Sequence, residues 1–227
     1  MSRIFISSSG TEIGKTFVAC TLIKQLQAAG FSVDALKPVA SGFDLLNIPD
    51  SDTGALLSAL GRNTTVEEAE RISPWRFQPA LSPDLAAARE QRSVPFDALV
   101  DYCTESRPCD LTLIEGIGGV MVPLDEAHTV LDWIEAVAAP LLLVVGGYLG
   151  TLSHTLTAIE ALHGRGQSVA GIVVNESDDQ PVSLDETTMV LERFADSIPV
   201  VALPRVDDYH AAPDLLPLIA RYIQPPC

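Results

Sequence analysis

The sequence has 227 residues, of which 47 % are hydrophobic and 6 % aromatic, and it carries a formal net charge of −16 at pH 7. This length suits one α/β domain, and the high apolar content excludes a disordered chain. The acidic charge argues against nucleic acid and anionic membranes as partners, because a phosphate backbone requires a basic surface. We therefore expect a single domain over residues 1–227 that binds neither nucleic acid nor membranes.

Apolar spacing and turn residues divide the chain into alternating strands and helices. In chain order, the pattern predicts a strand at residues 3–7, a helix at 16–29, a strand at 33–36, helices at 52–60, 85–90 and 96–104, a strand at 111–114, a helix at 129–138, a strand at 141–145, a helix at 153–162, a strand at 169–174, a helix at 184–195, a strand at 200–203 and a helix at 214–222. Residues 62–95 hold four prolines, so we expect a loop-rich excursion there that offers a substrate-binding surface. The alternation predicts an α/β fold with a mostly parallel, doubly wound sheet flanked by helices. Ligands of such sheets bind beyond the carboxyl ends of the strands.

A phosphate-binding loop is predicted between the first strand and the first helix. Residues 9–16 are SGTEIGKT, and Gly14-Lys15-Thr16 matches the end of a phosphate loop. Backbone N–H groups would face the phosphates of ATP, Lys15 would bridge the β and γ oxygens, and the Thr16 hydroxyl would hold Mg²⁺. The usual loop has glycine at the position of Ser9, where serine enters a left-handed conformation only with strain. This motif predicts a phosphate-loop NTPase-like fold.

Three charged residues elsewhere in the chain are candidates for the same site. Glu115 ends a strand, where its carboxylate can reach Mg²⁺ directly or through water, and the glycines of Gly116–Gly119 indicate backbone close to a ligand. Asp52 is a second candidate metal ligand, but it could equally cap the following helix. Pro38 restricts Lys37 to an extended conformation that directs its side chain into the crevice. Lys37→Ala is expected to fold normally and to lose about 10²–10³ in turnover.

These motifs together make the chain similar to dethiobiotin synthetases, which close a ureido ring on 7,8-diaminononanoate in biotin biosynthesis. The resemblance covers the whole chain and rests on Gly10–Thr16, Lys37–Gly42, Asp52, Glu115–Gly119, and Leu149-Gly150 with His154. It implies a cytoplasmic, ATP- and Mg²⁺-dependent cyclo-ligase. In this family the substrate takes up CO₂ as a carbamate, ATP phosphorylates the carbamate, and the second amine closes the ring with release of ADP and phosphate.

The resemblance also implies a role for each matching residue. Lys37, Lys15 and Thr11 would be catalytic, and Thr16, Asp52 and Glu115 would hold Mg²⁺. ATP would contact Glu12, Ile13, Gly14, Lys15, Thr16, Phe17, Asp52, Glu115, Gly116, Ile117, Gly118, Asn175, Glu176, Pro204, Arg205 and Val206, with Asn175 at the adenine. The substrate would contact Thr11, Lys37, Ser41, Gly150, Thr151 and Ser153. In the family's homodimer, the substrate carboxylate lies at the helix that follows Gly150 of the partner chain.

The sequence departs from the family pattern at three places. Ser8-Ser9-Gly10 replaces Gly-Thr-Asp, Asp84 replaces histidine, and Glu176 replaces aspartate. One alternative is a related ligase acting on another carboxylated substrate, although such chains usually carry an added glutaminase domain. The other is a partitioning-type ATPase, which needs a lysine early in the loop and a basic or membrane-anchoring surface. Residues 8–13 contain no lysine.

The cysteines show no spacing typical of disulfides or of zinc sites. Cys20, Cys103, Cys109 and Cys227 contain no Cys-x-x-Cys pair, which indicates reduced thiols of a cytosolic protein. The N-terminus lacks a signal-peptide pattern, and no apolar run reaches the ~18 residues that span a bilayer. We therefore expect a cytoplasmic protein.

Overall fold

Six parallel strands form the central sheet in a computed structural model that describes residues 2–178, 180–206 and 208–223. Across the sheet their order is β2-β5-β1-β6-β7-β8. Their bounds are β1 (Ser2–Ser8), β2 (Val33–Leu36), β5 (Leu111–Glu115), β6 (Leu141–Gly146), β7 (Val169–Asn175) and β8 (Val200–Leu203). Each predicted strand is present within one residue of its expected bounds. The strand order reverses at β1, so the crevice for ligands lies at the carboxyl end of β1, between β5 and β6.

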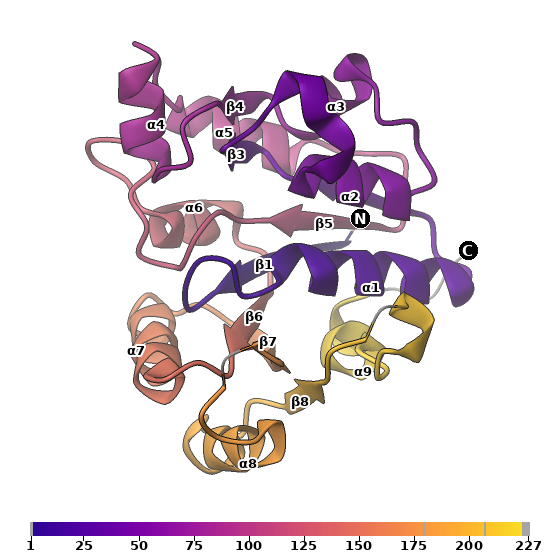
Figure 1. Cartoon of the computed structure of the whole chain (residues 1–227), viewed down its shortest axis with the longest axis vertical. Helices are drawn as coiled ribbons and strands as arrows, with labels where there is room; N and C mark the ends of the chain where they lie inside the picture. The colour runs from indigo at the N-terminus through magenta and orange to yellow at the C-terminus, as the bar shows by residue number, and fades with distance from the viewer. Residues whose placement is uncertain (1, 179, 207, 224–227) are drawn as a thin grey trace.

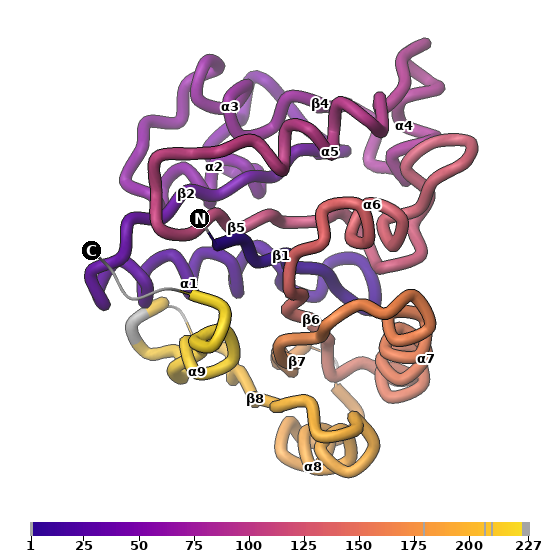
Figure 2. The backbone as a smooth tube through the Cα atoms, turned by 180° about the vertical axis from the view of Figure 1, so that it is seen from behind, coloured from indigo at the N-terminus to yellow at the C-terminus, as the bar shows by residue number. Residues whose placement is uncertain are grey.

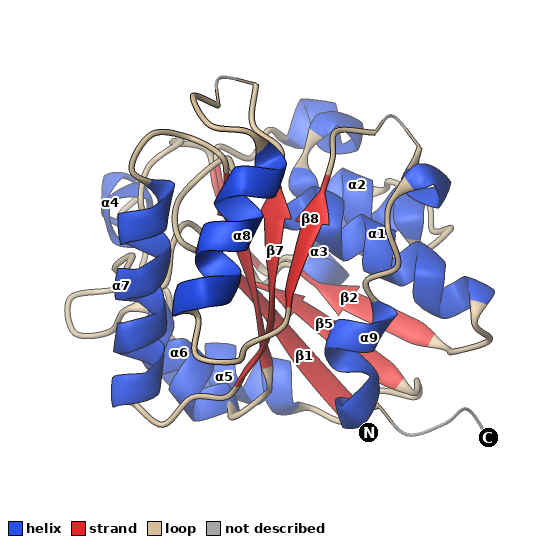
Figure 3. Cartoon of the chain, turned by 90° about the horizontal axis from the view of Figure 1, so that it is seen from below, coloured by secondary structure: helices blue, strands red, loops and turns tan. Residues whose placement is uncertain are grey.

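Helices cover both faces of this sheet (Figures 1 and 3). One face packs against α1 (Lys15–Ala28), α2 (Asp52–Ala59) and α9 (Leu216–Ile219). The other face packs against α5 (Phe96–Thr104), α6 (Val130–Val137), α7 (Thr151–Gly164) and α8 (Leu184–Phe194). The predicted fold class, a doubly wound α/β sheet, is therefore confirmed.

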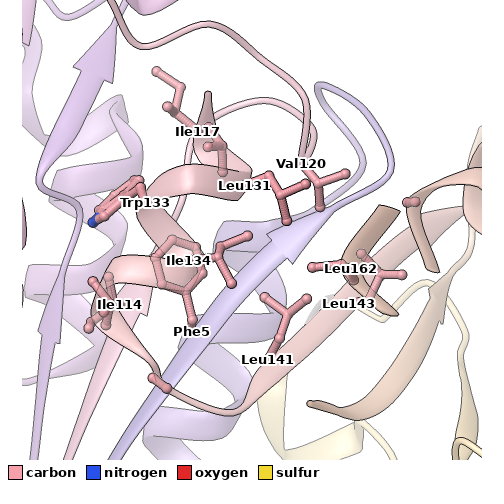
Figure 4. Packing of buried hydrophobic residues seen from close by; sticks show 14 of the residues in the cluster. Phe5, Ile114, Ile117, Val120, Leu131, Trp133, Ile134, Leu141, Leu143 and Leu162 are labelled. Atoms are coloured by element: carbon pink, nitrogen blue, oxygen red, sulfur yellow. The ribbon is translucent and has the colours of Figure 1, made fainter. Parts of the chain in front are cut away.

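The side-chain alternation of β1 explains how one strand serves both layers. Ile4 and Ile6 point to the α1 side, whereas Phe5 points to the opposite side. Phe5 meets Trp133 of α6 edge to face, with ring centroids 4.8 Å apart (Figure 4). All four side chains are fully buried, so β1 is fixed from both faces and its carboxyl end becomes a rigid support for the loop that follows.

The excursion after β2 is more regular than its prolines suggest. A small parallel sheet joins β3 (Val39–Ser41) to β4 (Trp75–Phe77), and between them lie η1 (Leu45–Asp50), α2 and α3 (Val66–Ile72). The expectation of a loop-rich segment was wrong for α3, whose N-cap Thr65 accepts a hydrogen bond from the Glu68 N–H. The alanine-rich helix is present as α4 (Pro83–Arg89). In Figure 2 the segment from α2 to α4 lies above the main sheet.

Three further expectations concern the chain ends, the thiols and the membrane. The last helix is shorter than predicted: η2 (Tyr209–Ala211) is followed by α9 and η3 (Ala220–Tyr222). Cys20, Cys103 and Cys109 are free thiols, while Cys227 lies outside the described residues. In the part of the chain that the structure describes, no helix is long and apolar enough to cross a membrane.

Candidate active site

The carboxyl ends of β1, β2 and β5 open into a cavity of about 580 Å³. The loop after β1 forms one wall and the segment that begins at Lys37 forms another. The predicted residues that line the cavity are Thr11, Glu12, Ile13, Gly14, Lys15, Thr16, Lys37, Ser41, Asp52, Glu115, Ile117 and Gly118. The structure therefore brings both lysines and all three predicted metal ligands to one place.

Two residues of the phosphate loop, Glu12 and Gly14, have a left-handed backbone conformation. Their φ angles are 57° and 88°, and Gly14 is the N-cap of α1. Ser9 keeps a negative φ, so the strain expected there is not present. Asn175 lies directly under the loop, because its side-chain amide donates to the Ile13 carbonyl at 3.1 Å. The amide of Asn175 thus holds the loop that precedes Lys15.

Gly14→Ala is expected to disrupt the loop for two separable reasons. A Cβ at Gly14 would lie 2.2 Å from Nδ2 of Asn175, and φ of 88° is costly for alanine. Gly30→Ala is the matched control, because Gly30 has the same φ but a Cβ added there would meet no atom within 4 Å. We expect Gly30→Ala to cost about 1–2 kcal/mol in urea unfolding, with ATP titrations unchanged. Gly14→Ala should cost more and weaken ATP binding at least about tenfold, and normal binding would contradict the loop assignment.

Lys37 is the centre of an ion cluster among the residues that line the cavity. Its Nζ lies 2.6 Å from Oε1 of Glu115, 3.0 Å from the Gly116 carbonyl and 3.3 Å from Oδ2 of Asp52. Oε1 of Glu115 also accepts a hydrogen bond from the Thr16 hydroxyl at 2.8 Å. Lys37 is 3 % and Glu115 1 % exposed. The structure therefore changes the expectation that Lys37→Ala folds normally, since that variant would leave the Glu115 carboxylate buried without this partner.

The charges of this cluster stabilise one another. Burial opposes the charged form of Lys37, yet the carboxylates of Glu115 and Asp52 hold its pKa above the ordinary value. Burial likewise opposes the charged form of Asp52, but Lys37 and the Thr16 hydroxyl lower its pKa. Lys37 is thus a fixed ammonium group, and Asp52 a fixed carboxylate, at neutral pH.

The structure rules out one of the two roles considered for Asp52, that of helix cap. The hydroxyl of Ser51 accepts from the Gly54 N–H and caps α2, so the capping role belongs to Ser51. Asp52 is the first residue of α2 and its carboxylate turns towards Lys37. The cap therefore positions Asp52 at the rim of the cavity, with its side chain 55 % exposed.

Lys15 is nearly buried beside this cluster. Its Nζ donates to Oγ of Ser8 at 3.1 Å. Burial, reinforced by the positive charge of Lys37, lowers the pKa of Lys15 to about 8, although Glu115 and Asp52 oppose that change. The ammonium groups of Lys15 and Lys37 thus both interact with the carboxylates of Glu115 and Asp52.

The other residues expected to contact ATP are not among those that line this cavity. Glu176 accepts a hydrogen bond from the Arg205 N–H at 2.7 Å, which ties the segment after β8 to the end of β7. Phe17 packs against Tyr209, with ring centroids 5.1 Å apart. Gly116 leaves no room for a side chain, because a Cβ would lie 2.9 Å from the Phe5 ring. Pro204 and Val206 flank Arg205 in the segment that follows β8.

The residues expected to contact the substrate carboxylate lie at the start of α7. Gly150 has φ of 97° and precedes the helix, and the Ser153 side chain is exposed. The Thr151 hydroxyl is buried and donates to the Gly146 carbonyl at 2.6 Å, so it is not a free donor for a substrate carboxylate. His154 pairs with the Tyr148 hydroxyl at 2.9 Å. None of Gly150, Thr151 and Ser153 is among the residues lining the described cavity.

Sequence reasoning missed part of the cavity wall. The missed residues are Ala40, Ala80, Leu81, Ser82, Pro83 and Val122. The segment 80–83 carried a signal, since its Ser-Pro pair interrupts the expected excursion and precedes a helix. Ala40 and Val122 carry no chemical signal, because they contribute shape alone.

The sheet order, the loop at the carboxyl end of β1 and the two lysines define a phosphate-loop nucleotide-binding protein. The solved structure of the signal recognition particle 54 kDa protein from Aeropyrum pernix K1 in complex with GDP has the same fold, with a TM-score of 0.51 and 15 % identity. The match covers 97 % of this chain and 46 % of that one, so this chain spans about half its length. The AAA domain family model matches residues 2–211.

Curated relatives narrow this class to one family. A protein of Acidiphilium cryptum is 46 % identical over 93 % of this chain and 96 % of its own. Proteins of Caulobacter vibrioides (44 % identical, 93 % and 96 % covered) and Cellvibrio japonicus (33 % identical, 95 % and 96 % covered) are also similar. All three are named ATP-dependent dethiobiotin synthetase. The chain belongs to the dethiobiotin synthetase family, as its motifs predicted.

Proposed function

We propose that this protein is an ATP-dependent ligase of biotin biosynthesis that closes the ureido ring of dethiobiotin from 7,8-diaminononanoate and CO₂. The observation that carries the proposal is the convergence of Lys15, Lys37, Thr16, Asp52 and Glu115 on one cavity at the carboxyl end of β1. A partitioning-type ATPase is not favoured, because the family relatives are synthetases. A ligase for another carboxylated substrate is not favoured for the same reason.

The residues of the cavity suit phosphoryl transfer to a carbamate. Such a transfer spreads negative charge over the phosphoryl oxygens, so catalysis depends on positioning and on fixed positive charge. Lys37, held in place by Glu115 and Asp52, would offer an ammonium group to the carbamate and the γ-phosphate. Lys15 and the Thr11 backbone would hold the phosphate from the loop side, and Ser41 would contact the carbamate. The ring then closes when the second amine displaces phosphate.

We propose Mg²⁺ as the cofactor, held by Thr16, Asp52 and Glu115. Mg²⁺ takes few protein ligands beside phosphates and waters, which suits one hydroxyl and two carboxylates. Oε2 of Glu115 supports this fit, because it is buried and has no hydrogen-bond partner in the described structure. When bound, Mg²⁺ would supply positive charge that neutralises the negative charge of the phosphates during transfer.

We also propose a cytoplasmic homodimer, in which the substrate carboxylate reaches the start of α7 of the partner chain. Gly150 and the exposed Ser153 hydroxyl are the candidates there, along with backbone N–H groups of the first helical turn. Asn175, Glu176 and Pro204–Val206 would line the pocket for the adenine. The net charge of −16 agrees with a small-molecule enzyme that binds neither nucleic acid nor membranes.

The reaction itself is the direct test. The protein is incubated with diaminononanoate, bicarbonate, Mg²⁺ and ATP, and mass spectrometry follows the ring-closed product and ADP. We expect equal amounts of both, with neither formed when diaminononanoate is left out. ADP release without the ring-closed product would overturn the proposal and leave an ATPase with another acceptor.

A further inference from the structure

We infer that Ser8 is a positioning residue that holds the Lys15 ammonium in place before ATP arrives. Ser8 is the last residue of β1, and its side chain is fully buried. In the described part of the chain, its Oγ is the hydrogen-bond acceptor that the structure gives to Lys15 Nζ, at 3.1 Å. The inference rests on the proposed function only through ATP binding, because it needs no particular acceptor substrate.

The hydroxyl of Ser8 is itself held in a fixed orientation. A serine hydroxyl has one proton to donate and lone pairs that accept. The carbonyls of Gly118 and Gly10 lie 2.8 and 2.6 Å from Oγ, so the proton points to one of them and a lone pair faces Lys15. The backbone adds a further link, because the Val120 N–H donates to the Ser8 carbonyl at 3.1 Å.

Ser8 thus connects three parts of the cavity: the phosphate loop, its lysine and the glycine-rich segment after β5. A long lysine side chain has many rotamers, and ordering it when a ligand binds costs free energy. An acceptor built into the end of a core strand removes part of that cost in advance. The same acceptor remains available when Lys15 turns its other protons to the phosphates, since an ammonium group has three donors.

Ser7 provides the matched control. It precedes Ser8 on β1, it is equally buried, and its Oγ has no hydrogen-bond partner in the described structure. Ser7→Ala and Ser8→Ala therefore remove the same hydroxyl from adjacent positions of one strand. The Ser8 hydroxyl touches Lys15, whereas the Ser7 hydroxyl does not take part in the cavity.

The test is calorimetric titration of the full chain with ATP and Mg²⁺. We expect Ser8→Ala to raise the Kd for ATP about tenfold, as for the loss of one hydrogen bond to a charged group, and Ser7→Ala to leave it unchanged. Steady-state assays should then show a raised KM for ATP with kcat within about twofold. Ser8→Thr, which keeps the hydroxyl, should restore the Kd.

A double-mutant cycle separates positioning from a purely structural role. In a Lys15→Ala background, Ser8→Ala should change the Kd by less than about twofold, because the group it positions is gone. An unchanged Kd in Ser8→Ala, or an equal rise in Ser7→Ala, would overturn the inference. So would a tenfold effect that persists without Lys15. Because the readout is ATP binding, failure of the ring-closing assay leaves this test intact.

Discussion

Lys37→Ala is expected to lower turnover by about 10²–10³, the effect of removing one preorganised charge from a developing oxyanion. The same change should also destabilise the protein. Glu115 is 1 % exposed, and its Oε1 lies 2.6 Å from Lys37 Nζ. Loss of one partner of a buried ion pair costs about 3–5 kcal/mol. For a chain of this size we expect the Tm to fall by on the order of 10 °C.

The two effects can be separated because their causes differ. Arg62→Ala is the control for stability alone, since Arg62 pairs with Asp34 and Glu68 away from the cavity. It should lower the Tm and leave turnover at 25 °C unchanged. In Lys37→Ala, turnover is measured well below the new Tm and compared with thermal unfolding of the same sample. Wild-type turnover there would remove Lys37 from the mechanism, and an unchanged Tm would contradict the buried ion pair.

The strand ends could be predicted from sequence because each carries its own local signal. Pro38 restricts the residue before it, so Lys37 had to leave β2 in an extended conformation. Glu115 closes an apolar strand and precedes glycines, a pattern that places a carboxylate where a ligand approaches. Parallel strands then bring such ends to one edge without any knowledge of side-chain contacts. This is why the lysines and the acidic residues of the cavity were predicted together.

Features that depend on long-range pairing could not be predicted in this way. Strands of three residues, such as β3 and β4, are too short to show a period of two. These two strands pair with each other although α2 and α3 separate them in the sequence. The cap of α2 could not be assigned from sequence because Ser51 and Asp52 are both residue types that cap helices, and the structure gives this role to Ser51. The hydrogen bond of the Thr151 hydroxyl could not be predicted either, because its partner is the Gly146 carbonyl, five residues earlier around a turn.

Lys15→Ala is expected to abolish most of the thermal stabilisation that ATP gives. A ligand at 100 times its Kd stabilises a protein by about 2.7 kcal/mol. That corresponds to a rise in Tm of roughly 5–10 °C for a chain of this length. Lys15 lies in the loop at the start of α1, where the phosphates would bind. If its loss weakens binding about 100-fold, the same ATP concentration stabilises the variant by only about 0.4 kcal/mol.

The variant without ATP should be close to wild type in stability. Lys15 is 7 % exposed and its pKa is lowered to about 8, mainly by burial, so keeping its ammonium charged inside the folded protein is costly. Removing it relieves that cost and offsets the loss of packing. Lys24→Ala is the matched control, because Lys24 lies on the same helix but outside the cavity lining, and its ATP-induced shift should equal that of wild type. A wild-type shift in Lys15→Ala would show that ATP binds elsewhere than this loop.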